Sequence, residues 1–157
     1  MSVVIHQESL TETFIHEVAP LLARHWREIA LYQEDVPLDL DWKVYRRMNE
    51  EGTLLLIAAR DEGRLAGYAA FFLVRSPHYK STLCGMNDVI FVAPEFRKSH
   101  IGLRLIRESE SLLSTRGVKL IRWHVKQFNA DGTDNPLYKI LVRLGYRLEE
   151  LTVGKLL

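Results

Sequence analysis

A basic turn between an apolar strand and a helix is the part of this sequence best suited to chemistry. Within Val89–Ile106, which reads VIFVAPEFRKSHIGLRLI, a β-type run ends at a proline and a helical pattern begins at Leu103. The first N–H groups of a helix lack intrahelical partners, and the helix dipole there favours negative charge. Arg97 and Lys98 add positive charge, and Gly102 lets a ligand approach the backbone closely. These features predict an anion site suited to a pyrophosphate.

The same residues resemble the signature of the GNAT superfamily of acetyl-CoA-dependent N-acetyltransferases. The stretch from Val92 to Arg97 matches Val-x-Pro-x-x-Arg position for position. Arg97 to Gly102 then matches Arg/Gln-x-x-Gly-x-Gly/Ala, except that His100 stands where the first Gly is usual. An ordinary strand–turn–helix connection is the alternative, and the ordered match disfavours it. The resemblance implies that acetyl-CoA binds here, at these residues: Phe91, Val92, Arg97, Lys98, Ser99, His100, Ile101, Gly102, Leu103 and Asn129.

Asp88 is the expected general base. It enters an otherwise apolar strand four residues before Val92, where several family members carry a Glu. A carboxylate in such a strand is unusual. An amine with a pKa near 10.4 is mostly protonated at neutral pH, so a carboxylate that binds it and relays its proton is useful. The alternative, weighed equally, is a structural carboxylate that faces solvent or accepts backbone N–H groups from the turn around Asn87.

Tyr138 is the expected general acid. The family usually has a Tyr four residues before the Gly that closes the last helix, and here that Gly is Gly145 and the position is Leu141. Tyr138 lies one helical turn earlier on almost the same face, so it either reprotonates the departing thiolate or packs in the core. Because a thiolate with a pKa near 8.5 is a fair leaving group, the reaction can also proceed without an acid.

Two further pairs of residues belong to the region around the strand expected at 118–126: one pair follows that strand and the other lies on it. Asn129 has the spacing at which the family places an Asn that binds the cofactor, and Asn135 competes for the same match. Of the neighbours Trp123 and His124, one is expected to face the substrate side and the other the core. A lone histidine on a strand is more often structural, although its near-neutral pKa suits a second base.

Strand and helix patterns alternate along the chain and predict a single α/β (α+β) domain over residues 1–157. Strands are expected at 2–6, 53–59, 64–74, 83–92, 118–126 and 147–156. Helices are expected from a capping box at Ser9–Glu12 to Ile29 with a kink or break at Pro20, from Asp39 or Asp41 to Gly52, at 103–116 and at 136–144. The resemblance implies a mixed, mostly antiparallel sheet of six to seven strands with about four flanking helices, and strands four and five splayed at a β-bulge.

Composition narrows the class of protein. A length of 157 residues fits one domain, and a net charge of +1 argues against a dedicated nucleic-acid surface. Cys84 is the only cysteine, so no intrachain disulfide forms, which fits a reducing cytosol. The six histidines lack ligand spacing, so no metal is expected. With neither a signal-peptide pattern nor a long apolar run, the sequence predicts a cytoplasmic protein away from membranes.

The leading hypothesis is an N-acetyltransferase that moves the acetyl group of acetyl-CoA to a primary amine of a small molecule, protein or peptide, by direct attack in a ternary complex. A catalytically inactive CoA-binding or interaction module is the alternative; His100 and Leu141 favour it, and Asp88 and Gly102 oppose it. Toxin-type acetylation of aminoacyl-tRNA is a further alternative, which the near-zero net charge weakens. No motif identifies the acceptor, and a homodimer is left open.

Overall fold

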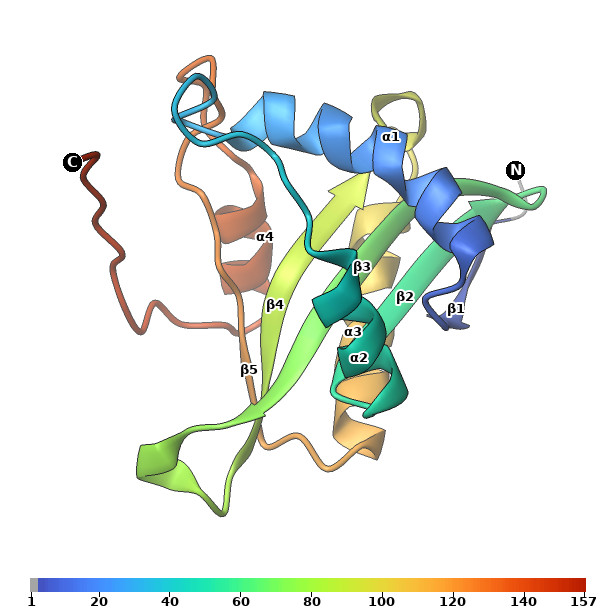
Figure 1. The fold of residues 1–157 in the computed structure, drawn as a ribbon, viewed down its shortest axis with the longest axis vertical. Coiled ribbons are helices and arrows are strands. Elements are labelled where there is room, and N and C mark those ends of the chain that lie inside the picture. The colour runs from blue at the N-terminus through green and yellow to red at the C-terminus, as the bar shows by residue number, and fades with distance from the viewer. Residues whose placement is uncertain (1–2) are drawn as a thin grey trace.

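Five strands form one mixed sheet in the computed structural model, which describes residues 3–157 (Figure 1). The strands are β1 (Val3–Glu8), β2 (Leu54–Asp61), β3 (Arg64–Arg75), β4 (Leu83–Val92) and β5 (Leu120–Arg122), in that order across the sheet. Neighbours from β1 to β4 pair antiparallel, and β5 pairs with β4 in parallel. The mostly antiparallel character of the sheet is confirmed, whereas six to seven strands was wrong.

The missing strand is the one expected at 147–156. These residues are coil, and Val153 within them is 93% exposed. β5 is also shorter than the predicted 118–126, because its neighbour β4 leaves it after Met86. A strand at 147–156 would therefore have no long neighbouring strand edge with which to form backbone hydrogen bonds. At the other end of the chain, the strand expected at 2–6 lies at 3–8, and residue 2 is outside the described residues.

Residues 3–157 contain four α-helices, as expected: α1 (Glu12–Ile29), α2 (Trp42–Glu50), α3 (Ile101–Thr115) and α4 (Leu137–Arg143). Pro20 does not split α1, which was one of the two expected outcomes. The carbonyl that loses its helical donor belongs to His16, and both residues lie on the exposed side of the helix. Water can satisfy that carbonyl, so the proline is tolerated. None of the helices in this range is long and apolar enough to cross a membrane.

The helices cover both faces of the sheet. α1 and α2 lie on one face and α3 lies on the other (Figure 1). Side chains alternate along β3, so Tyr68 and Ala70 face α1 and α2 while Ala69 and Phe71 face α3. The two faces together bury a continuous apolar core, and the candidate site lies on the α1 and α2 side.

A β-bulge and a divergence of strands set the shape of β4. Phe71 of β3 pairs with Asn87 and the preceding Ala70 pairs with Val89, so Asp88 is the extra, unpaired residue of a bulge. β5 pairs with β4 only at Cys84–Met86. Within residues 3–157, the edge of β4 beyond Met86 therefore has no strand partner on the side of β5. The expected splaying of strands four and five at a bulge is confirmed.

Candidate active site

The bulge at Asp88 is held by the side chain of its neighbour Asn87. This amide is almost fully buried, and its Nδ2 donates to the carbonyl of Val89 at 3.0 Å and to that of Ala70 at 3.4 Å. Both carbonyls flank the unpaired residue, so the amide replaces ladder bonds that the bulge removes. The bulge thereby turns the Asp88 side chain toward α2.

The Asp88 carboxylate accepts a hydrogen bond from Tyr45. The Tyr45 hydroxyl donates to Asp88 Oδ2 at 2.9 Å, and its ring packs against Trp42 and Phe72, each at 5.9 Å between ring centres. Burial raises the pKa of Asp88, although the hydrogen bond from Tyr45 and the charge of His124 act the other way. Asp88 is exposed over a large part of its surface, but the apolar surroundings of its carboxyl group make ionisation costly. A raised pKa makes this carboxylate a stronger base.

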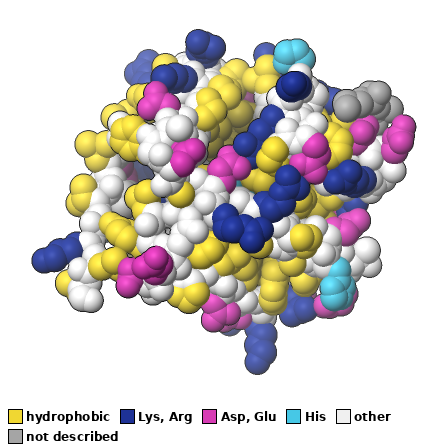
Figure 2. All heavy atoms as spheres, turned by 90° about the horizontal axis from the view of Figure 1, so that it is seen from above, with side chains coloured by type: hydrophobic (Ala, Val, Ile, Leu, Met, Phe, Trp, Pro, Cys, Tyr) yellow, Lys and Arg dark blue, Asp and Glu magenta, His cyan; other side chains and the backbone are white. Residues whose placement is uncertain are grey.

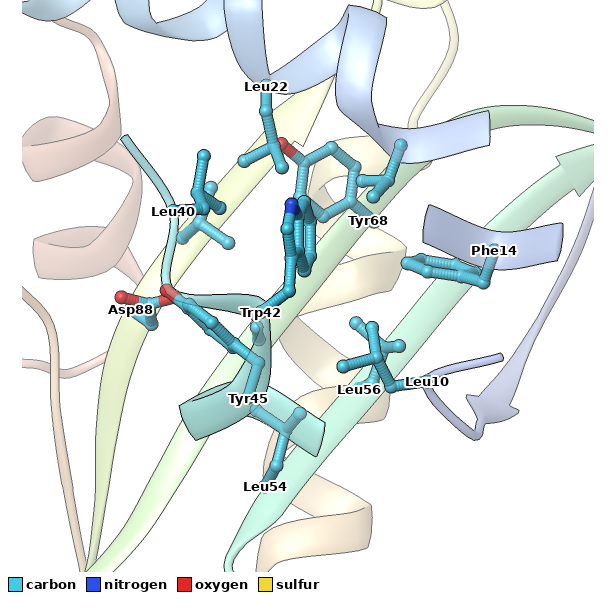
Figure 3. Close-up of a pocket in the computed structure, with 13 residues that line it drawn as sticks. Leu10, Phe14, Leu22, Leu40, Trp42, Tyr45, Leu54, Leu56, Tyr68 and Asp88 are labelled. Carbon is cyan, nitrogen blue, oxygen red and sulfur yellow. The ribbon is translucent and has the colours of Figure 1, made fainter. Parts of the chain in front are cut away.

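An apolar pocket opens beside Asp88, between α1, α2 and the sheet (Figure 3). Phe14 of α1, Trp42 of α2 and Leu56 of β2 contribute to its walls, and among residues 3–157 Asp88 is the only charged one in its lining. Tyr68 of β3 also lines it, and burial raises the pKa of this phenol. The pocket can therefore hold hydrocarbon, with a single negative group at its edge.

The turn after β4 leads directly into the N-terminus of α3. The helix begins at Ile101, two residues earlier than expected, and its first recorded i→i−4 bond joins Arg104 N–H to the His100 carbonyl at 3.0 Å. The N–H groups before Arg104 thus have no helical acceptor. His100 has φ −78°. This backbone conformation is ordinary for any residue, so the histidine at the family's glycine position is not strained.

Gly102 has no structural need to be glycine. A Cβ built there would meet only Val92 Cγ2, at an ordinary 3.8 Å, and its φ is not positive. Gly67 is different, because a Cβ there would lie 2.8 Å from the Phe91 carbonyl oxygen. Neither conformation nor packing explains Gly102, so its open backbone is free for a ligand that approaches closely.

Arg97 lies back over the end of β4. Its Nη2 pairs with Glu28 Oε2 at 2.6 Å, its Nε donates to the Val92 carbonyl at 2.9 Å, and its guanidinium lies 5.3 Å from the centre of the Phe91 ring. Lys98 is exposed beside it. Figure 2, a view of the molecule from above Figure 1, shows Lys and Arg side chains lying beside Asp and Glu side chains on that surface. The charge of Arg97 is therefore already paired.

Two other residues of the turn are placed by local contacts. Ser99 Oγ donates to the Phe96 carbonyl at 2.5 Å, so its hydroxyl closes the turn. Leu103 lies in the first turn of α3 and is half-buried. The structure thus brings Phe91, Val92 and the residues from Arg97 to Leu103 together at one end of β4.

The two asparagines that follow β5 make bonds within their own loop. Asn129 Nδ2 donates to Thr133 Oγ1 at 3.0 Å, and the backbone N–H of Leu137 donates to Asn135 Oδ1 at 3.0 Å. Asn135 therefore forms an Asx-type turn that leads into α4, whose N-cap is Pro136. Asn129 shapes the turn before the helix, and the choice between Asn129 and Asn135 as the family's cofactor-binding Asn stays a prediction.

The expected site residues of α4 and of the chain after β5 differ in how far they are exposed to solvent. Tyr138 is 44% exposed, whereas Leu141, at the family's usual Tyr position, is buried. Trp123 packs edge-on against Phe71 with ring centres 5.1 Å apart, and His124 is exposed. Trp123 therefore packs with the core, and the expectation that its neighbour His124 faces the substrate side stays a prediction. Within residues 3–157, no group of three or more His, Cys, Asp or Glu side chains could hold a metal ion.

Sequence reasoning missed the tyrosines of this site. No motif in the sequence singles out Tyr45 or Tyr68 as a residue of the site. The contact between Tyr45 and Asp88 spans 43 residues. No local pattern signals such a contact, although a tyrosine on an apolar helix face often needs a partner for its hydroxyl.

Solved structures resemble this fold over nearly its whole length. An aminoglycoside acetyltransferase, HMB0005, from an uncultured soil metagenomic sample shares 22% identity with a TM-score of 0.75, covering 100% of this chain and 99% of that one. A ribosomal-protein-alanine N-acetyltransferase from Brucella melitensis biovar Abortus 2308 shares 20% identity with a TM-score of 0.71, covering 99% of each chain.

A third similar structure is that of AAC(6')-Iy in complex with the bisubstrate analogue CoA-S-monomethyl-acetylneamine. It shares 19% identity with a TM-score of 0.63, covering 99% of this chain and 97% of that one. Identities this low establish the fold alone. Among curated proteins, none matches the chain.

The family comparison reaches further. The model of the Acetyltransferase (GNAT) family matches residues 15–138, a range that runs from the first turns of α1 into α4 and includes the bulge at Asp88 and the turn after β4. The bulged fourth strand, its divergence from β5 and the open N-terminus of α3 lie within that match. The chain therefore belongs to the Acetyltransferase (GNAT) family.

Proposed function

We propose that the protein is an N-acetyltransferase that moves the acetyl group of acetyl-CoA to a primary amine. The observation that carries this proposal is the position of Asp88, a carboxylate with a raised pKa at the bulge of β4. It lies between an apolar pocket and the strand edge that β5 leaves free. Family membership supports acetyl-CoA as the donor, and a similar structure that holds a CoA analogue supports it further.

The donor is bound along β4 and at the start of α3. Backbone groups of Phe91 and Val92 pair with the pantetheine arm, and one N–H polarises the thioester carbonyl. The pyrophosphate lies against the N–H groups at His100–Leu103, with Lys98 beside it. The Arg97 guanidinium contributes positive charge to the pyrophosphate site once its ion pair with Glu28 breaks. Asn129 contacts the donor after the loop that contains it rearranges. Holding both substrates converts a collision into a positioned reaction.

Asp88 handles the proton of the acceptor. The ammonium group gives one proton to the carboxylate, directly or through a water molecule, and the neutral nitrogen attacks the thioester carbon. The N–C bond forms and the C–S bond breaks, so that sulfur leaves as a thiolate. The second proton passes from nitrogen to water as the amide forms, and the thiolate takes up one proton, from Tyr138 or from water. Tyr45 holds the carboxylate in place throughout.

Thiol release from acetyl-CoA, measured against a panel of amines, tests the proposal. Asp88→Asn should lower turnover at neutral pH by roughly 10²–10⁴-fold, the usual contribution of a general base. Raising the pH should restore part of the rate, because more of the amine is then neutral. An equal loss at every pH would instead mean that Asp88 positions the substrate.

Donor binding is measured separately in the same samples. Acetyl-CoA at 100 times its dissociation constant should stabilise the fold by about 2.7 kcal/mol, in the wild type and in Asp88→Asn alike. Binding without thiol release from any amine would support the inactive CoA-binding module. The absence of a melting shift would contradict the donor assignment.

A further inference from the structure

A half-buried histidine of α1, His25, lies over the end of β4 and has no part in the proposed reaction. It follows Val18 and Leu21 at helical spacing, so it continues the side of α1 that faces the sheet. Its ring lies 4.9 Å from the ring of Phe91 between centres, where α1 crosses the end of β4 (Figure 1). Burial lowers the pKa of His25 from its ordinary 6.5 to about 4, so the imidazole is neutral at pH 7.

Two charged side chains flank this imidazole. Glu28 follows His25 by three residues on α1, so both side chains leave the same side of the helix. Arg97, from the turn after β4, pairs with Glu28 Oε2 at 2.6 Å and lies 5.3 Å from the centre of the Phe91 ring. The charge of Glu28 acts to raise the pKa of His25, and the charge of Arg97 acts to lower it. His25 and Arg97 therefore lie beside the same carboxylate and the same aromatic ring.

Arg24 is a second cation near Glu28, one helical turn before it on α1. Its guanidinium already makes a two-bond contact with Glu95, in which Nη1 donates to Oε1 at 3.2 Å and Nη2 donates to Oε2 at 2.8 Å. Arg24 would have to break this contact in order to pair with Glu28, whereas His25 needs only a proton. Asp88 is not among the charges that act on the pKa of His25.

Donor binding changes this cluster, because the pyrophosphate attracts the Arg97 guanidinium. Glu28 is half-buried, so losing its partner would leave a poorly solvated charge unpaired. We infer that His25 is a positioning residue of the donor site: when the pyrophosphate draws Arg97 away from Glu28, His25 takes up one proton from solvent and replaces Arg97 as the partner of Glu28. This inference rests on the proposed acetyltransferase function and deepens it, since it couples binding of the donor to protonation.

The strength of the coupling follows from the change of partner. A close opposite charge changes the pKa of a group by about 1–3, so pairing with Glu28 should raise the pKa of His25 from about 4 to between about 5 and 7. At pH 5, donor binding should then take up about 0.4–0.9 proton per molecule. With a pKa of about 6 in the complex, donor affinity should be about tenfold higher at pH 5 than at pH 8.

Isothermal titration calorimetry with dephospho-CoA measures the proton uptake. This ligand keeps the pyrophosphate but lacks the 3′-phosphate, whose own ionisation near pH 6 would obscure the result. Titrations at pH 5 in two buffers of different ionisation enthalpy give the number of protons taken up. His25→Gln should remove both the uptake and the rise in affinity toward low pH. His16→Gln, at an exposed position of the same helix, is the matched control and should keep both.

Nuclear magnetic resonance reports the protonation of His25 in the wild type itself. The imidazole signal of this residue is identified by its absence from the spectrum of His25→Gln. A saturating concentration of dephospho-CoA should raise the pKa read from that signal. Arg97→Gln should raise it without any ligand, because Glu28 then has no other partner from the turn. Glu28→Gln should prevent the rise that dephospho-CoA produces.

Failure of this inference is distinguishable from failure of the proposed function. Donor binding and thiol release without protonation of His25 would overturn the inference and leave the function standing, with Arg24 or water serving Glu28. Proton uptake that persists in His25→Gln would belong to another group, which also overturns it. An unchanged pKa of His25 in Arg97→Gln would show that the two cations do not share Glu28, with the same consequence. If neither dephospho-CoA nor acetyl-CoA binds, the donor assignment is contradicted and the inference fails with it.

Discussion

Replacing Gly102 with alanine should move stability and donor binding in opposite directions. The residue lies in the first turn of α3, and a Cβ there would meet only Val92 Cγ2 at 3.8 Å. Alanine is favoured over glycine in a helix by roughly 0.5–1 kcal/mol, so Gly102→Ala should raise the free energy of unfolding by up to that amount. For a chain of this length, this corresponds to a rise of about 1–4 °C in melting temperature.

The same methyl group should weaken acetyl-CoA. If the pyrophosphate lies against the backbone of Gly102, the Cβ pushes it away from at least one N–H group. A hydrogen bond to a charged group is worth about 1.5–3 kcal/mol, so losing one should raise the dissociation constant about 10- to 150-fold. Gly102→Asp should weaken binding further, because it adds a negative charge beside the phosphates.

Urea denaturation and isothermal titration calorimetry measure the two effects on one protein preparation. Ser114→Ala, at an exposed position in the last turn of α3, is the matched control. It should also stabilise the helix by a few tenths of a kcal/mol, and it should leave donor affinity unchanged. Unchanged affinity in Gly102→Ala would refute the position of the pyrophosphate. A loss of stability would refute the conclusion that the fold does not need glycine there.

Three further predictions follow from the contacts around the site and the turn. Burial raises the pKa of Asp88 and the hydrogen bond from Tyr45 opposes this rise, so Tyr45→Phe should move the acidic limb of the kcat/KM profile to higher pH. Asn87→Leu should lower the free energy of unfolding by about 1–3 kcal/mol in urea, because buried carbonyls lose their donor. The hydrogen bond from Arg24 lowers the pKa of Glu95 to about 2, below its ordinary 4.5. The pair therefore stabilises the fold fully above pH 4.5 and progressively less as the pH falls toward 2. Glu95→Gln should make the stability less dependent on pH over that range in acid denaturation curves, and added salt should reduce the difference in stability between the variant and the wild type.

Local patterns in the sequence predicted most of the fold. Helical periodicity located all four helices, although α1 has Thr11 as its N-cap and not the Ser9 of the expected capping box. The strand expected at 147–156 does not form. Residue types show which segments suit a strand, but a ladder also needs a neighbouring edge, and β4 leaves β5 after Met86. The residues of a strand therefore do not show whether a bulge elsewhere in the sheet has removed the edge that the strand needs.

Part of the candidate site could also be predicted from local sequence, and part could not. The turn from Arg97 to Gly102 and the carboxylate of Asp88 could be predicted, because they follow one another along the chain. Tyr45 and Tyr68 could not, since their positions relative to Asp88 depend on how α2 and β3 pack. The pairing of Arg97 with Glu28 was equally hidden, because it joins α1 to the end of β4.

The free edge of β4 beyond Met86 also gives the strand two populations of backbone amide. Amides that point to β3 are bonded within the ladder, so their hydrogen exchange should require opening of the sheet. Those that point toward the gap left by β5 should exchange in the ligand-free protein on the timescale of local fluctuations. A molecule that lies along this edge would slow exchange at alternate residues of one strand and nowhere else in the sheet. Amide exchange can therefore report occupancy of the gap without turnover, a label or knowledge of the acceptor.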